Sequence, residues 1–332
     1  MAMTGCWQCA RTDGQAVVSV PRVAAVAERL VLVLLLASTL IACSGPSEPA
    51  RKTNADDTSS GPLTVYVVNY PLQYFAQRVG GSHVRVTFPV PSDSDPAYWE
   101  PTVEQIGDFQ QADLILLNGA SYAKWVQRVS LPASRVVDTS AGFSARYIAI
   151  ADQATHSHGA GGEQQHGELA FTTWLDPLLA VAQAAAIRDA LIRLRPAAAA
   201  GLRRNFTALE KDLRELDDQL AAAFAARKGQ PLLFSHPVYQ YLIRRYGIEG
   251  YSLHWEPNVV PGPSESQGLD RLLGEHPARE MIWEGAPDSA IVEKLAQRGV
   301  NSLVFEPCAG QPAEGDYLSV MLDNLGRLSV GQ

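Results

Sequence analysis

The sequence predicts an α/β protein with two lobes, each a parallel sheet with flanking helices, joined by one long rigid helix. Short apolar segments typical of buried strands occur in two sets, one on each side of a helical region. Helical patterns separate the segments within each set, and this alternation is typical of parallel sheets covered on both faces. The chain of 332 residues is also longer than one compact core usually requires.

The N-terminal lobe is predicted over residues 63–196. Its four buried strands are expected at Thr64–Tyr70, Val84–Val90, Asp113–Gly119 and Arg135–Ser140. A helix with a clear start and stop ends this lobe. Asp176 is expected as its N-cap, Pro177 stands at the first helical position, and Pro196 closes it.

The linking helix is predicted over residues 197–228. Its large apolar residues recur every three or four positions and so form one stripe: Leu202, Phe206, Leu209, Leu213, Leu216, Leu220 and Phe224. A helix of this size is about 45 Å long. The stripe also fits a coiled-coil dimer seam. We favour a rod within a monomer, because a lobe precedes it and another follows it in the sequence.

The C-terminal lobe is predicted over residues 229–332. Its strands are expected at Pro231–His236, Tyr251–Trp255, Met281–Gly285 and Ser302–Pro307. Ligands of open α/β sheets bind at the carboxyl ends of strands. The residues found there are one histidine and three carboxylates: His236, Glu256, Glu284 and Glu306. This set suits a divalent cation better than a sugar or an amino acid.

The N-terminus predicts export and a lipid anchor. Residues 1–42 are interpreted as a lipoprotein signal peptide with an N-terminal extension, because the apolar run Leu30–Ala42 is too short to span a bilayer comfortably and ends in small residues. The run continues into "LIAC", which resembles the bacterial lipobox, so Cys43 is expected to carry the lipid. A short membrane anchor that happens to end in cysteine is the alternative. Residues 43–62 are polar and are predicted to be a flexible tether. The protein is therefore expected on a bacterial membrane, facing the periplasm or the cell exterior.

Charge and cysteine content exclude several classes of function. The net charge is −8 and there is no basic patch, so nucleic acid is not an expected ligand. Cys6 and Cys9 lie in the signal region and Cys43 carries the lipid, which leaves Cys308 without a disulfide partner. No Ser-His-Asp spacing, phosphate-binding loop or nucleophile elbow is present, so no enzymatic activity is predicted.

The stretch "HSHGAGGEQQHG", His156–Gly167, contains His156, His158 and His166 together with flexible glycines. No side chain in it could build a core. Histidine-rich tracts of this kind are typical of metal binding. Three interpretations stay open: ligands to a metal site, a loop that captures metal weakly, or a solubilising loop.

The sequence resembles the substrate-binding lipoproteins of ABC importers for zinc and manganese over nearly all of the mature chain. The resemblance rests on five segments in the family's order: "SDPAYWEPT", "ADLILLNGASYAKW", "TTWLDPLLAVAQAAAIRDAL", "FSHPVYQYLIRRYGI" and "FEPCAG". It implies a binding protein that captures a divalent transition metal between two lobes and delivers it to a permease with its ATPase. Zinc is the expected ion, and manganese is possible.

The resemblance also implies four metal ligands. They fall at Ala97, Thr172, His236 and Glu306, so two first-lobe histidines of the family are replaced. Alanine has no donor atom, and a threonine hydroxyl is a poor zinc ligand.

Nearby histidines offer replacements for the two lost ligands. His156, His158 and His166 lie just before Thr172 in the sequence and are the candidates, with Glu284 as a further candidate ligand. Three alternatives stay open. The chain could be a paralogue that binds another small ligand, or a periplasmic metal buffer or chaperone. A zinc hydrolase with Glu284 as base is the weakest alternative, because no HExxH signature is present.

Overall fold

The computed structural model describes residues 61–150, 155–157, 163–165 and 169–330. The predicted signal peptide, Cys43, His158 and His166 lie outside the described residues. Two four-stranded parallel sheets with flanking helices are present, which confirms the predicted fold class. None of the helices in the described part of the chain combines the length and apolarity of a membrane span.

The N-terminal lobe contains a parallel sheet in the order β2-β1-β3-β4. Its strands are β1 (Leu63–Val67), β2 (Val84–Thr87), β3 (Leu114–Leu117) and β4 (Val136–Asp138). Helices α1 (Tyr70–Gly80) and α2 (Val103–Gln111) connect them. Thr102 caps α2 through a capping box with Gln105, which ends the preceding loop at a defined residue. That loop carries residues 88–102 from the carboxyl end of β2.

The C-terminal lobe contains a second parallel sheet in the order β10-β9-β7-β8. Its strands are β7 (Leu232–Phe234), β8 (Gly250–Ser252), β9 (Glu280–Trp283) and β10 (Asn301–Val304). Its helices are α5 (Gln240–Tyr246), α6 (Pro263–Glu275) and α7 (Ser289–Ala296). All strand pairs in this sheet are parallel, so the residues that follow the four strands lie at one edge.

Two long helices link the lobes. Helix α3 (Pro177–Leu194) has the predicted cap, since the Asp176 carboxylate accepts hydrogen bonds from the first-turn N–H groups of Leu178 and Leu179. Helix α4 (Ala199–Ala225) buries all seven residues of the predicted apolar stripe. It packs on α3, on α1 of the first lobe and on α5 of the second lobe. The apolar stripe is therefore buried by contacts within the chain, as expected for a linking helix inside one molecule.

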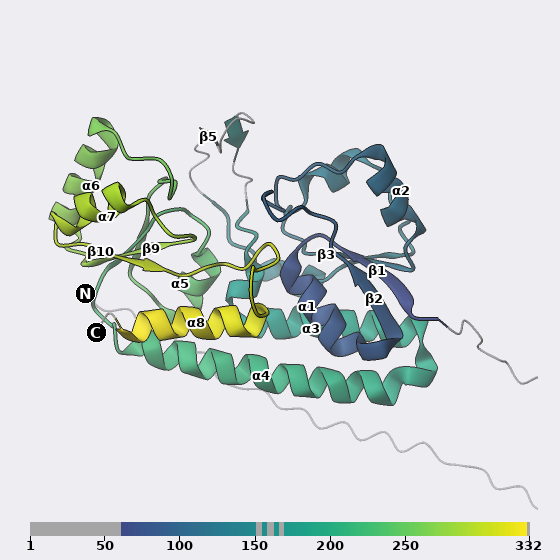
Figure 1. Cartoon of the computed structure of the whole chain (residues 1–332). Helices are drawn as coiled ribbons and strands as arrows, with labels where there is room; N and C mark the ends of the chain where they lie inside the picture. Colours follow the sequence, from purple (N-terminus) through teal and green to yellow (C-terminus); the bar gives the residue numbers. More distant parts are fainter. Residues whose placement is uncertain (1–60, 151–154, 158–162, 166–168, 331–332) are drawn as a thin grey trace, which may run out of the picture. The chain divides into compact units, whose positions relative to one another are not determined.

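The last helix adds a feature that the sequence analysis did not predict. Helix α8 (Tyr317–Val330) packs along α4 and also contacts α1 (Figure 1). The C-terminal segment of the chain thus returns from the second sheet to the linking helices. This return is what brings the loop after β10 against the first lobe.

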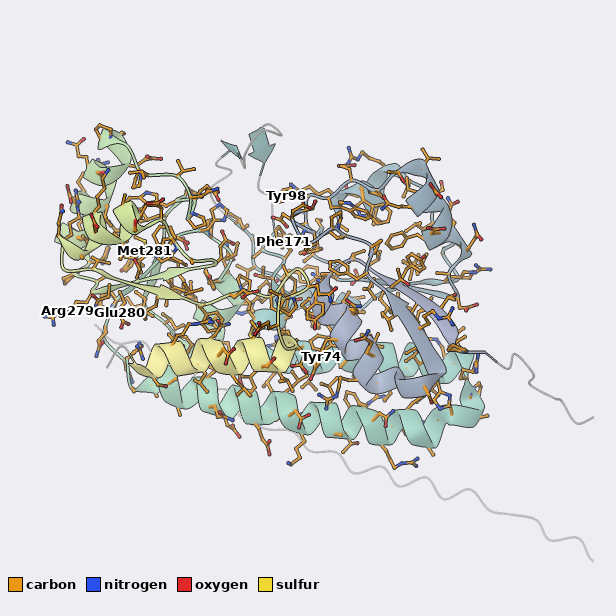
Figure 2. The ribbon with its side chains drawn as sticks, in the orientation of Figure 1. Tyr74, Tyr98, Phe171, Arg279, Glu280 and Met281 are labelled. Atoms are coloured by element: carbon orange, nitrogen blue, oxygen red, sulfur yellow. The ribbon has the colours of Figure 1, made fainter. Side chains whose placement is uncertain are left out.

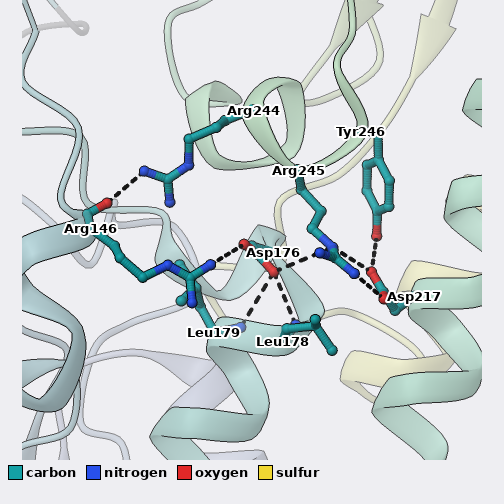
Figure 3. Close-up of polar contacts among 8 residues, drawn as sticks. All are labelled: Arg146, Asp176, Leu178, Leu179, Asp217, Arg244, Arg245 and Tyr246. Atoms are coloured by element: carbon teal, nitrogen blue, oxygen red, sulfur yellow. Dashed lines mark hydrogen bonds and ion pairs between the residues drawn. The ribbon is translucent and has the colours of Figure 1, made fainter.

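A polar network ties the start of the second lobe to the linking helices (Figure 3). Arg245 of α5 donates to Asp217 of α4 at 2.8 and 2.5 Å, and its guanidinium lies 3.8 Å from Asp176. Arg146 of the first lobe lies 3.6 Å from the other oxygen of Asp176. Since Asp176 is buried, each arginine offsets part of the cost of keeping its charge away from water. The network fixes α5, and with it the short segment between β7 and α5.

An antiparallel bridge between Ala149 and Leu169 flanks the segment that contains the histidine-rich loop, residues 156–167. Between the two bridge residues, β5 (Thr155–Ser157) pairs with β6 (Glu163–Gln165), and His156 stands opposite Gln164. The chain therefore leaves and returns at one place, directly before the segment that contains Thr172.

Candidate metal centre

A pocket of about 280 Å³ is lined by residues from both lobes. The first lobe contributes mainly aromatic and hydroxyl side chains: Asp95, Pro96, Tyr98, Tyr122, Phe171, Thr172 and Trp174. The second lobe contributes acidic side chains and one histidine: His236, Val238, Glu284, Glu306 and the segment 307–310. A larger hollow of about 900 Å³ lies along β10 and α8, but its lining has no histidine. The smaller pocket is therefore the candidate site.

His236 stands between carboxylates at this edge of the second sheet. Its neighbour Ser235 continues the end of β7 through a 2.8 Å hydrogen bond to the carbonyl of Ile282. The His236 side chain is 4% exposed, with Nδ1 3.9 Å from Glu284 Oε1 and Nε2 3.8 Å from Glu256 Oε1. The structure thus brings together His236, Glu256 and Glu284, three of the four strand-end residues that the sequence predicts as the surroundings of a cation.

Glu306 reaches the same pocket from the loop after β10. Its backbone N–H donates to Asn324 Oδ1 at 2.9 Å, and its carbonyl accepts from Asn324 Nδ2 at 2.8 Å. Asn324 is fully buried on α8, so the backbone of Glu306 is held in place while its side chain lines the pocket. Burial raises the pKa of Glu306, and the positive charge of Arg327 opposes this shift.

Hydrogen bonds across the lobes hold the pocket walls together. Trp174 Nε1 donates to the carbonyl of Pro307 at 2.7 Å, and the N–H of Tyr70 donates to the carbonyl of Ala309 at 2.9 Å. The hydroxyl of Thr172 donates to the carbonyl of Val238. At the position where the resemblance implies a histidine ligand, the side chain therefore makes a structural bond between the lobes.

Ala97 occupies the other implied ligand position, and it is buried in the main hydrophobic core rather than in the pocket wall. Its N–H donates to Asp95 Oδ1 at 2.9 Å. This bond orders the loop so that the residues on both sides of Ala97, Pro96 and Tyr98, face the pocket. Asp95 itself lines the pocket and is a first-lobe carboxylate that the sequence analysis did not select.

The aromatic wall was also missed from the sequence. Tyr98 and Phe171 lie close together (Figure 2). Their rings are edge to face with centroids 6.5 Å apart, and Tyr122 packs on Phe171 at 5.1 Å. Burial raises the pKa of Tyr98 to about 12, and the negative charges of Asp95 and Glu284 add to the effect. Tyr98 and Tyr122 both lie in segments on which the family resemblance rests. Their place in these segments was the one sign in the sequence that they could line the site.

The described residues alone do not complete a metal site. Among them, no group of three or more His, Cys, Asp or Glu side chains is placed to hold a metal ion. The side chain of His156, and all of His158 and His166, lie outside the described residues. Cys308 is buried and lines the pocket, and burial raises the pKa of its thiol, which disfavours the thiolate that a metal would bind.

Residues 65–331 match the family described as zinc-uptake complex component A, periplasmic. The chain belongs to this family. Membership in the zinc-uptake component A family confirms the resemblance drawn from the five segments. The family is described as a component of a zinc-uptake complex, which agrees with the binding role expected from the sequence.

Relatives within the zinc-uptake component A family have low sequence identity to this chain but match it over most of its length. The zinc-binding lipoprotein AdcA of Streptococcus pneumoniae is 23% identical over 308 residues, which cover 90% of this chain and 60% of AdcA. The high-affinity zinc uptake system protein ZnuA of Bacillus subtilis is 23% identical, with 87% of this chain and 92% of ZnuA covered. The chain thus spans about 60% of the length of the AdcA relatives that it matches.

Solved structures show the same fold. The metal-dependent lipoprotein YcdH from Bacillus subtilis superposes with a TM-score of 0.69 at 21% identity, over 81% of this chain and 98% of YcdH. Zn(II)-bound AdcA from Streptococcus pneumoniae gives a TM-score of 0.67 at 20% identity, over 81% of this chain and 57% of AdcA. These likenesses support the two-lobed α/β architecture with its long linking helix.

Proposed function

We propose that this chain is the exported, lipid-anchored substrate-binding protein of an ABC importer, and that it delivers zinc to the permease and its ATPase. The observation that carries the proposal is the interlobe pocket, whose lining includes both His236 and Glu306, in a chain that belongs to a family of zinc-uptake components. Histidine nitrogen and carboxylate oxygen are common zinc ligands. Manganese is the second candidate ion, and the histidine content favours zinc.

In this proposal His236 and Glu306 bind the ion from the second lobe, with Glu284 as a further ligand. Zinc requires about four ligands, so the second-lobe pair is not sufficient. Two of the loop histidines His156, His158 and His166 supply the rest. The position of the loop ends supports this assignment. The bridge residue Leu169 lies two residues before Phe171 and three before Thr172, and both of these line the pocket.

Elemental analysis tests the proposed function. The mature protein, purified without added metal, is expected to contain about one zinc ion and to yield it slowly to a competing chelator. A protein that contains no divalent metal and takes up no zinc would contradict the proposal and favour a paralogue with another ligand. Zinc binding without any effect of the gene on zinc import would favour the periplasmic buffer or chaperone.

The lipid anchor is a separate part of the proposal and rests on Cys43. Replacing Cys43 with serine removes the thiol that accepts the lipid, so the Cys43→Ser variant is expected in the soluble fraction after cell breakage. The Cys308→Ser variant is the matched control and should stay with the membranes, as the parent does. A Cys43→Ser variant that still fractionates with membranes would contradict the anchor.

A further inference from the structure

The pocket between the lobes is larger than one metal ion requires. Its volume is about 280 Å³, and a water molecule occupies about 30 Å³ in the liquid, so about nine groups of that size fit inside. A zinc ion takes its ligands at about 2.0–2.3 Å and fills only a small part of this space. The first-lobe side of the pocket therefore has room to contact a small organic molecule.

The hydroxyl of Tyr122 is a buried polar group without a hydrogen-bond partner among the described residues. Tyr122 lines the pocket and is 2% exposed. Burial raises the pKa of this hydroxyl, and the charges of Asp95 and Tyr98 add to the effect. Both of these residues also line the pocket. A buried hydroxyl without a partner is unfavourable, and a donor group on a ligand in the pocket would remove that cost.

Two partly exposed aromatic rings form a corner beside Tyr122. The rings of Tyr98 and Phe171 stand at 77° to each other, and Phe171 also packs against Tyr122. The faces of such rings attract ammonium groups, and rings at right angles are the basis of aromatic cages for organic cations. One ammonium group of the chain already uses this attraction, since Lys124 Nζ lies 4.6 Å from the centroid of the Tyr98 ring.

The opposite side of the pocket carries carboxyl groups. Glu284 and Glu306 line it from the second lobe. Burial raises the pKa of Glu306, so a cation bound nearby would favour its ionised form. On the first-lobe side, Asp95 has the ammonium group of Lys124 near it. Aromatic rings on one side and carboxyl groups on the other suit an organic cation better than an anion or a neutral sugar.

We propose that the pocket also binds a small organic ammonium ion, a primary amine or diamine of up to about nine non-hydrogen atoms. An ammonium N–H donates to the Tyr122 hydroxyl, the carbon chain packs on Phe171, and the positive charge faces Glu284 and Glu306. The inference goes beyond the proposed function, because it assigns a second class of ligand to the pocket. Zinc and the amine then compete for the same carboxylates.

Isothermal titration of metal-free protein with 1,4-diaminobutane gives the first test. The neutral analogue 1,4-butanediol has the same chain length and should bind at least about tenfold more weakly. Phe171→Leu keeps an apolar side chain but removes the ring, so the affinity for the diamine should fall by about tenfold. Equal affinity for diamine and diol, or an unchanged diamine affinity in Phe171→Leu, would overturn the inference.

The Tyr122→Phe variant tests the hydroxyl separately. The affinity for the diamine should fall by about tenfold or more, because a hydrogen bond to a charged group is lost. The matched control is Tyr251→Phe, which removes a hydroxyl outside the pocket and should bind the diamine as the parent does.

Thermal unfolding of the ligand-free Tyr122→Phe variant checks that its hydroxyl has no partner within the chain. Since the described residues provide none, the variant should unfold at the same temperature as the parent or at a higher one. A clearly lower unfolding temperature would reveal an internal partner and would contradict the proposed role of the hydroxyl.

Failure of the inference and failure of the proposed function give different results. If the parent binds zinc but not the diamine, the second ligand class is wrong and the zinc role stands. If the diamine binds in a manner that depends on Phe171 and Tyr122 while no zinc binds, the inference stands and the proposed zinc role is wrong. If both bind, added zinc should lower the apparent affinity for the diamine, and independent binding would place the amine outside this pocket.

Discussion

Replacing His236 with alanine is expected to weaken zinc binding by about a hundredfold or more, which corresponds to about 2.7 kcal/mol of binding free energy. The imidazole is the nitrogen donor in the described lining of the pocket, and the carboxylates around it are weaker partners for a borderline ion such as zinc. A water molecule in the vacated position would restore little of the lost affinity.

Competition titration against a chelator of known affinity measures this change. The matched control is His276→Ala, since His276 stacks on Tyr251 at 3.8 Å and does not line the pocket. Glu306→Ala should also lose affinity, because it removes the second ligand of the pair. If both His236→Ala and Glu306→Ala bind zinc as tightly as the parent, the pocket is not the zinc site.

Changing His156, His158 and His166 together to alanine is the second change with a large expected effect. If the loop completes the site, the ion keeps only its second-lobe ligands, and affinity should fall by about as much as in His236→Ala. Adding His236→Ala to the triple variant should then cost less than the sum of the two losses, because both sets act on one ion.

Isothermal titration that measures stoichiometry distinguishes a loop that completes the zinc site from a loop that only captures metal weakly. A loop that only captures metal predicts that the triple variant keeps one tight site and loses weaker ones. The control changes Gln164 and Gln165 to alanine, which alters the same loop without removing a histidine. Unchanged stoichiometry and affinity in the triple variant would show that the loop has no role in binding zinc.

Much of the fold follows from local sequence patterns. The cap at Asp176, the proline at the first helical position and the apolar stripe of α4 act within one helix, and all are present in the structure. The eight strands of the two parallel sheets overlap their predicted segments, because buried parallel strands need continuous apolar runs. Several observed strands are shorter: β7, β9 and β10 end before His236, Glu284 and Glu306, whose side chains line the pocket.

The remaining features depend on contacts between distant segments. Nothing local in the sequence indicates that α8 returns along α4, or that the Thr172 hydroxyl bonds to the carbonyl of Val238. Asp95 was missed for a similar reason, because its place in the pocket wall depends on how the loop after β2 folds over Ala97. The expectation that ligands bind at the carboxyl ends of parallel strands located His236, Glu284 and Glu306. It could not show which ring nitrogen of His236 faces which carboxylate.

The central claim is that zinc binds between the lobes on His236 and Glu306. Anomalous diffraction from crystals of the zinc-loaded protein, recorded on both sides of the zinc absorption edge, tests it most directly. We predict a peak in the interlobe pocket about 2.0–2.2 Å from a nitrogen of His236 and an oxygen of Glu306. Zinc peaks only at other positions, with none in this pocket, would contradict the account.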